Sequence, residues 1–120
     1  MNVQYLLDEN LAPIYREQLL RRQFDLVVWM VGDPYAPAKG TQDPEILFWC
    51  EKNSCLLVTN NRRSMPVHLA DHLTQGRHVP GILVLRPRAE IGQVVDDLLA
   101  IAGASLKDEY RDRILYIPLN

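Results

Sequence analysis

The chain of 120 residues lacks any long, uninterrupted apolar run. A bilayer span needs about 20 consecutive apolar residues, so no membrane partner is expected. The opening residues, MNVQYLLDEN, also lack the basic region followed by an apolar region that marks a secretory signal. We therefore expect a cytoplasmic protein.

Cysteines are few, and the chain carries no excess of positive charge. The two cysteines, Cys50 and Cys55, fit reduced thiols in the core, with a disulfide or a metal pair as the alternative. The formal net charge of -2 argues against a broadly basic, non-specific nucleic-acid binder, although it leaves room for a small basic site. A Gly-rich phosphate loop, a nucleophile elbow and a dinucleotide fingerprint are all missing, which excludes the enzyme classes that depend on them.

The sequence does contain an alternation of apolar strand-like runs and amphipathic helix-like segments. No repeat or linker interrupts the alternation, and 48% apolar content is enough for one core, so residues 1–120 are expected to form a single domain. Strands are expected at 3–7, 26–31, 55–59, 81–85 and 114–117. Helices are expected at 11–22 after Asn10, from Asp43 and Pro44 onward, at 65–73 and at 89–102.

This alternation predicts a three-layer α/β/α fold with a mainly parallel sheet of about five strands. The carboxyl ends of the first, third and fourth strands then carry the polar segments 8–9, 60–63 and 86–88. Ligands of such folds bind at the carboxyl ends of the strands. If the first and third strands are neighbours, the acids at 8–9 face the basic turn at 60–63 across one crevice.

Three short motifs occur in order along the chain: LLDENL at 6–11, DPEIL at 43–47 and LVTNNR at 57–62. With these motifs the chain resembles the compact PIN-like domains, a nuclease-like α/β group that includes toxin components of prokaryotic toxin–antitoxin pairs. The resemblance covers roughly residues 3–85. It implies RNA as the substrate and a small antitoxin protein as a partner, and it leaves a homodimer open.

The resemblance also implies a ribonuclease site in which carboxylates hold one or two Mg²⁺ or Mn²⁺ ions. Hard ions of this kind take oxygen ligands, and the ion activates water and balances charge on the phosphate. By position, Asp8 and Asp43 match two acids of that site, and Glu9 is a further candidate ligand. Asn61 stands where the family has an aspartate, and Arg63 stands where a second aspartate commonly follows.

These two departures predict weak or absent metal binding. Asn61 can offer a carbonyl oxygen but no charge, and Arg63 adds a positive charge, whereas affinity at such sites follows ligand charge. Guanidinium groups bind phosphate oxygens well, so Arg62 and Arg63 are candidate contacts for RNA phosphates. The alternative to a metal-dependent ribonuclease is therefore a catalytically weakened module of the same fold that binds RNA or protein.

Each candidate residue also has a structural interpretation. Asp8 can satisfy backbone N–H groups in its turn, and Asp43 can be a helix N-cap with Pro44 as the first helical residue. Glu9 and Glu45 can be solvated charges, and Arg62 with Arg63 can form an ordinary exposed turn.

Two histidines and one tyrosine complete the candidates. His68 and His72 lie one helical turn apart, which can suit zinc, but the third ligand is missing and both are expected on the polar face of their helix. Tyr35, in the Pro- and Gly-rich segment 32–41, could stack on a base.

Overall fold

The computed structural model describes residues 3–119, in which five strands alternate with four helices. All the strands expected from the sequence are present. In chain order the elements are β1 (Gln4–Leu7), α1 (Ile14–Arg22), β2 (Val27–Met30), α2 (Asp43–Asn53), β3 (Leu56–Thr59), α3 (Met65–Thr74), β4 (Ile82–Leu85), α4 (Ile91–Ala104) and β5 (Ile114–Ile117).

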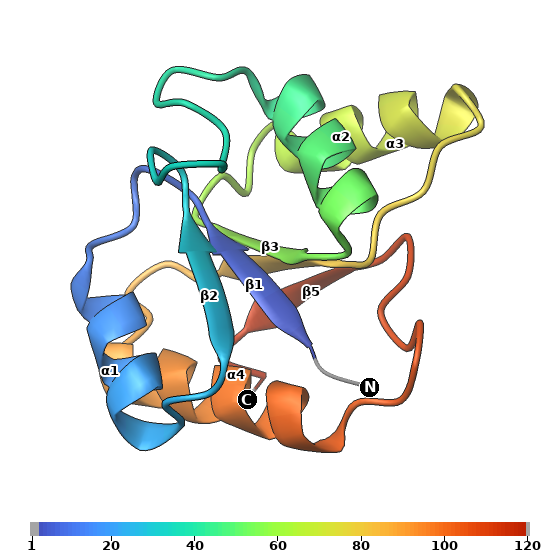
Figure 1. The fold of residues 1–120 in the computed structure, drawn as a ribbon. Helices are drawn as coiled ribbons and strands as arrows, with labels where there is room; N and C mark the ends of the chain where they lie inside the picture. The colour runs from blue at the N-terminus through green and yellow to red at the C-terminus, as the bar shows by residue number, and fades with distance from the viewer. Residues whose placement is uncertain (1–2, 120) are drawn as a thin grey trace.

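The strands form one sheet in the order β2-β1-β3-β4-β5, and every pair is parallel (Figure 1). The predicted three-layer fold is confirmed, and the first and third strands are indeed neighbours. In this order the chain runs to one side of β1 first and then to the other, so the connections from β1 and β3 leave the sheet in opposite directions. The crevice between the carboxyl ends of β1 and β3 is the position at which doubly wound sheets bind ligands.

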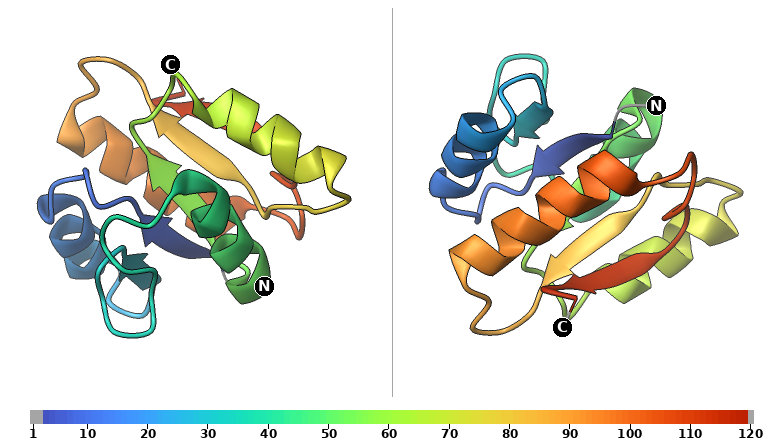
Figure 2. Two further views of the ribbon diagram at one scale, coloured as in Figure 1. Left: turned by 90° about the horizontal axis from the view of Figure 1, so that it is seen from above. Right: turned by 90° about the horizontal axis from the view of Figure 1, so that it is seen from below.

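Helices cover both faces of the sheet, α1 with α4 on one face and α2 with α3 on the other (Figures 1 and 2). Successive strand residues alternate between the two cores, as the period of a strand requires. Tyr5 and Leu7 pack with α1 and α4, whereas Leu6 packs with α2 and α3. The central strands are therefore buried on both faces, which explains why they read as continuous apolar runs.

Three helix starts differ in position or in cap from the sequence-based expectation. Helix α4 begins at Ile91, two residues after the expected Ala89. The helix expected from Leu11 begins at Ile14, because residues 8–11 form a turn closed by the Leu11 N–H to the Asp8 carbonyl (3.1 Å). Pro13, which has no N–H to place, is the N-cap of α1. In α2 the N-cap is Gln42, so Asp43 is the first helical residue and its side chain makes no capping hydrogen bond.

The structure bears on two further expectations. Between residues 3 and 119, none of the helices has the length and apolar character needed to cross a bilayer. Cys50 and Cys55 are both buried and free, as expected of reduced core thiols.

Candidate functional site

A polar hollow lies at the carboxyl ends of β1 and β3, the crevice singled out by the strand order. Its volume is about 270 Å³, room for a hydrated cation or a phosphate group. Segment 40–42 forms one wall. The other lining residues, which define the acidic pocket, are Asp8, Glu9, Asn10, Asp43, Asn61 and His68.

Asp8, directly after β1, is the most deeply buried acid of this pocket, with 7% of its surface exposed. Its Oδ1 accepts a hydrogen bond from the Glu9 N–H (2.8 Å), and its Oδ2 accepts one from the Thr59 hydroxyl (3.0 Å). Burial raises the pKa of Asp8, and the negative charges of Asp43 and Glu9 raise it further, although the two hydrogen bonds partly oppose this. The two hydrogen bonds thus fix the orientation of the carboxylate, while no positive group of residues 3–119 compensates its charge.

Asp43 reaches the same pocket from the first turn of α2, where it contacts Asn61. The Asn61 Nδ2 donates to Asp43 Oδ2 (2.7 Å) and to the Ser64 hydroxyl (2.8 Å), while Asn61 Oδ1 accepts from the Ser64 N–H (3.2 Å). A carboxylate can only accept and a backbone N–H can only donate, so these contacts fix the orientation of the amide. Asn61 therefore presents a donor to Asp43, and its carbonyl oxygen is already used by the turn.

Glu9 connects the pocket to the long segment between β2 and α2. Its Oε1 accepts a hydrogen bond from the Gly40 N–H (2.8 Å), which fixes one end of that segment at the rim. The other carboxylate oxygen of Glu9 has no hydrogen-bond partner among the described residues. Glu9 thus lines the pocket, as a ligand would, and also fixes a loop.

His68 belongs to the site, although the sequence placed it on a solvated helix face. It lies in the first turn of α3, half-buried, with its Nε2 3.8 Å from Asp43 Oδ2. A helix that follows β3 starts at the ligand-binding edge, so a histidine in its first turn was the available signal.

His72, expected beside His68 on the polar face, is buried instead with 3% exposure, and that expectation was wrong. It lies one turn further from the pocket, and its Nε2 contacts the Glu51 carboxylate at 2.9 Å. The two histidines therefore face different surroundings and do not form a pair.

Arg62 and Arg63 are exposed and are not part of the acidic pocket lining. The Arg62 N–H donates to the Asn60 carbonyl (3.0 Å), which closes a tight turn over Asn60–Arg62. Their place next to Asn61 keeps them near the pocket along the chain.

The charges of the acidic pocket suit a cation. No Lys or Arg of segment 3–119 lines it or forms an ion pair with its three carboxylates. Those residues also contain no set of three closely converging ligand side chains that could hold a metal ion alone. Mg²⁺ commonly keeps several waters and binds through one or two carboxylates plus a substrate phosphate, without an all-protein cage. Asp8, Asp43 and Glu9 fit a site of this kind, in which a few carboxylates, waters and a substrate phosphate share the ion.

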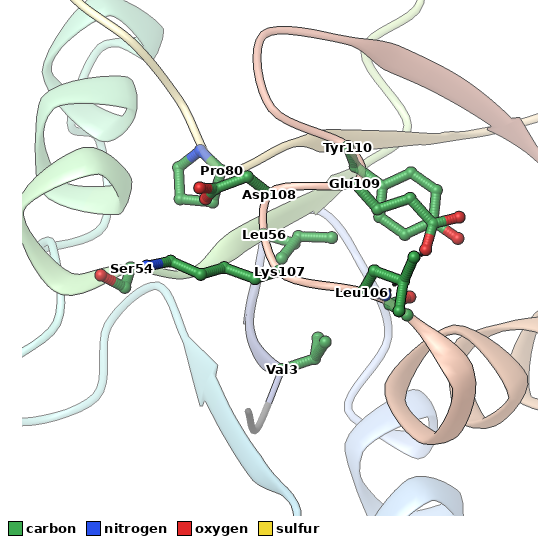
Figure 3. A pocket seen from close by; sticks show the side chains of 10 residues that line it. Val3, Ser54, Leu56, Pro80, Leu106, Lys107, Asp108, Glu109 and Tyr110 are labelled. Carbon is green, nitrogen blue, oxygen red and sulfur yellow. Dashed lines mark hydrogen bonds between the residues drawn. The ribbon is translucent and has the colours of Figure 1, made fainter.

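A second hollow lies at the opposite edge of the sheet, beside the segment between α4 and β5 (Figure 3). Its volume is about 90 Å³. The carboxyl groups of Asp108 and Glu109 point away from one another in this view, and Leu56 and Leu106 supply apolar surface. None of the residues expected at a functional site lines this hollow.

Comparison with models of known protein families, with curated proteins and with solved structures finds no match to this chain. The likeness to PIN-like domains therefore stays a prediction from the three motifs.

Proposed function

We propose that this protein is a PIN-like, metal-dependent ribonuclease-type domain whose acidic pocket binds Mg²⁺ or Mn²⁺ weakly. The observation that supports this most is the meeting of Asp8 and Asp43 in one polar hollow at the carboxyl ends of β1 and β3. Negative side chains without a paired Lys or Arg at this position of the sheet favour a cation that is completed by a phosphate ligand.

Each residue of the pocket has a separate task in this proposal. Asp8 and Asp43 hold the divalent ion, and Glu9 adds a third negative charge. The bound ion supplies an activated water and offsets charge on the scissile phosphate. The Thr59 hydroxyl orients Asp8, and Asn61 orients Asp43. Because the Asn61 amide occupies one oxygen of Asp43, the ion binds less tightly than it would beside a third aspartate.

Calorimetric titration of Mn²⁺ together with an RNA cleavage assay tests the proposal. The wild type is expected to bind Mn²⁺ weakly and to cleave RNA only when Mn²⁺ is added, and Asp8→Asn is expected to abolish both. Glu45→Gln is the matched control, because Glu45 is an exposed acid two residues after Asp43 that does not line the pocket. Equal Mn²⁺ binding by wild type and Asp8→Asn would contradict the proposal.

A second candidate function is a module that holds RNA without cleaving it. The hydrogen bond from Asn61 to Asp43 favours this candidate, since the amide partly replaces the cation that the acids would otherwise attract. RNA binding without Mn²⁺, combined with no cleavage at any Mn²⁺ concentration, would support this function over the first.

The partner and the compartment belong to the same proposal. A toxin component would meet a small antitoxin protein in the cytoplasm, where the free thiols of Cys50 and Cys55 stay reduced. Co-expression with the product of a neighbouring gene, followed by size-exclusion chromatography, would detect such a partner and would separate it from a homodimer.

A further inference from the structure

Tyr35 combines an exposed aromatic ring with an unfavourable backbone conformation. The side chain is 91% exposed, and the residue has φ +70°, in the left-handed region. Bulky residues rarely adopt this conformation, because the Cβ atom approaches the neighbouring backbone. An exposed ring contributes no burial to offset that strain, so folding alone gives no reason for a tyrosine here.

Two other residues with positive φ, Ser54 and Asp112, have local explanations. Ser54 ends helix α2, where a left-handed residue is common and its N–H bonds to the Cys50 carbonyl. Asp112 is of a type that tolerates this region, and its carboxylate accepts the Val79 N–H (2.8 Å). Tyr35 is the third residue of a turn closed by the Ala36 N–H to the Asp33 carbonyl (3.1 Å), a position that favours Gly or Asn. The turn accounts for the backbone conformation but gives no reason for a large aromatic side chain, and strain of this sort is typical of functional sites.

The segment that carries Tyr35 is firmly braced. The Asp33 carboxylate accepts hydrogen bonds from Arg16 (2.5 Å) and from the Met30 N–H (2.9 Å). Inside the segment, the Gly32 N–H bonds to the carbonyl of Pro37 (2.8 Å), and Pro37 is buried. The ring is therefore presented on a fixed turn, which lowers the entropy lost when a ligand binds.

The same segment leads directly to the acidic pocket. Its residues 40–42 line the pocket, and Glu9 fixes Gly40 there. Gly40 lies five positions after Tyr35, so their Cα atoms are at most about 18 Å apart, at about 3.6 Å per residue. Figure 1 shows the segment between β2 and α2 arching beyond the carboxyl ends of the strands.

We infer that Tyr35 is a stacking platform for an unpaired base of an RNA strand whose backbone passes the acidic pocket. This inference rests on the proposed function and names its substrate as single-stranded. An exposed aromatic ring stacks on any base, and single-strand sites cover about 4–16 nucleotides, which spans the distance from Tyr35 to the pocket. The exposed Arg62 and Arg63 near the pocket suit a polyanion better than an apolar protein surface.

Filter binding of a single-stranded RNA of about 12 nucleotides to the full chain, in a Ca²⁺ buffer, tests the inference. Tyr35→Asn is expected to weaken binding by about 5- to 150-fold, the loss of one base–aromatic stack, whereas Tyr35→Phe keeps wild-type affinity. Phe24→Asn is the matched control, because Phe24 is 88% exposed but lies between α1 and β2, at the opposite edge of the sheet. It is expected to leave affinity unchanged.

Folding stability and two other nucleic acids supply independent readouts. Asn tolerates the left-handed region, so Tyr35→Asn is expected to unfold at an unchanged or higher urea concentration. A clear fall in the urea midpoint would give the ring a structural role and overturn the inference. The Tyr35→Asn variant should lose affinity for single-stranded DNA by the same factor as for RNA, since the ring contacts a base and not a sugar. An equal loss of affinity for duplex RNA, whose bases are already stacked, would overturn base stacking.

The inference and the proposed function can fail separately. Unchanged RNA affinity in Tyr35→Asn, with Asp8-dependent Mn²⁺ binding intact, would overturn the stacking role and leave the ribonuclease proposal standing. Absence of both Mn²⁺ binding and RNA binding in the wild type would overturn the two together.

Discussion

The two edges of the sheet carry similar side chains, but their charges are paired in different ways. At the amino edge, Glu51 Oε1 accepts hydrogen bonds from His72 (2.9 Å) and Arg77 (3.2 Å), and Asp112 accepts one from His78 (2.7 Å). At the carboxyl edge, the acids of the pocket face one another, an amide and a half-buried histidine.

The pKa values move in opposite directions at the two edges. Partial burial alone would raise the pKa of Glu51, but hydrogen bonds from Arg77 and His72 outweigh it and lower the pKa. At Asp8 burial dominates and the pKa rises. Paired acids of the first kind stabilise the fold, whereas an unpaired, desolvated acid costs stability unless a ligand compensates it. The contrast therefore separates a structural cluster from a candidate binding site made of the same residue types.

The largest expected effect on stability comes from breaking the amino-edge cluster. Glu51→Ala removes charge-assisted hydrogen bonds to Arg77 and to the buried His72, and should lower the free energy of unfolding by about 1.5–3 kcal/mol. Because the folded-state pKa of Glu51 is lowered, its contribution is present above the ordinary value of 4.5 and is lost as the pH falls through the folded-state pKa. Urea unfolding at neutral and acidic pH measures both.

Glu45→Ala is the control for that loss. Glu45 lies on the same helix but is exposed, so its removal should change stability by less than about 0.5 kcal/mol. Neither variant of these two acids is expected to change Mn²⁺ binding. A Glu51→Ala protein that unfolds like the wild type would remove the distinction between paired and unpaired acids.

The next effect concerns the Asn61 amide, which donates a hydrogen bond to one of the acids of the pocket, Asp43. Asn61→Asp replaces the donor 2.7 Å from Asp43 Oδ2 with a second negative group. The metal-free protein should lose about 1–3 kcal/mol of unfolding free energy, and Mn²⁺ should restore it by binding the folded state more tightly than in the wild type. Thermal unfolding with and without Mn²⁺ measures the change, with the exposed neighbour Asn60→Asp as control. Equal Mn²⁺ stabilisation of both variants would show that position 61 does not control the metal.

The sequence predicted the fold and the meeting of Asp8 with Asp43 because both depend on strand order and on the ends of strands. Alternating elements imply parallel strands, and parallel strands bring their carboxyl ends to one edge. The same argument would have placed His68, in the first turn after β3, at this edge. The orientation of the Asn61 amide could not be predicted in this way, because it depends on rotamers and on its partner Ser64, which is placed only after the turn is built.

The sequence-based predictions of where α1 begins and of an exposed His72 failed for a related reason. Apolar periodicity placed Leu11 in the helix, and Leu11 is indeed buried, but from a turn that precedes Pro13. His72 was expected in solvent because its partner Glu51 is 21 residues away along the chain. A local pattern reports which face is buried, and it does not report a distant ion pair that makes a polar side chain acceptable there.

A smaller effect of opposite sign is expected at Asp8. Because burial raises its folded-state pKa, Asp8 favours folding most below the ordinary value of 3.8, and this contribution is lost as the pH rises through the folded-state pKa. Asp8→Asn should therefore raise the urea midpoint at neutral pH, with a gain that fades toward pH 3.8. The Asn amide can donate to the Thr59 hydroxyl oxygen, which also accepts the Asn61 N–H, so one contact between residues 8 and 59 is kept. The Thr59 O–H loses its acceptor, which makes the expected gain small.

Asp33→Asn provides the contrast for Asp8→Asn. Arg16 and the Met30 N–H outweigh the effect of burial and lower the pKa of Asp33. The same exchange of carboxylate for amide should therefore lower the urea midpoint at neutral pH there. Two midpoints that move in the same direction would mean that charge pairing does not distinguish these acids.

The smallest effect is expected at the exposed turn after Asn61. Arg62→Ala with Arg63→Ala should leave stability unchanged, because both side chains are exposed. If they bind two RNA phosphates, affinity falls on the order of 10-fold at 0.1 M salt, and the slope of log affinity against log salt becomes shallower by about 1.4, at about 0.7 per contact. Arg111→Ala with Arg113→Ala changes the net charge equally at the amino edge and should leave affinity and slope closer to the wild type. Filter binding over a salt series compares the two pairs. Equal losses would mean that RNA senses only the total charge of the protein, whereas a loss confined to the first pair would locate the phosphate contacts beside the acidic pocket.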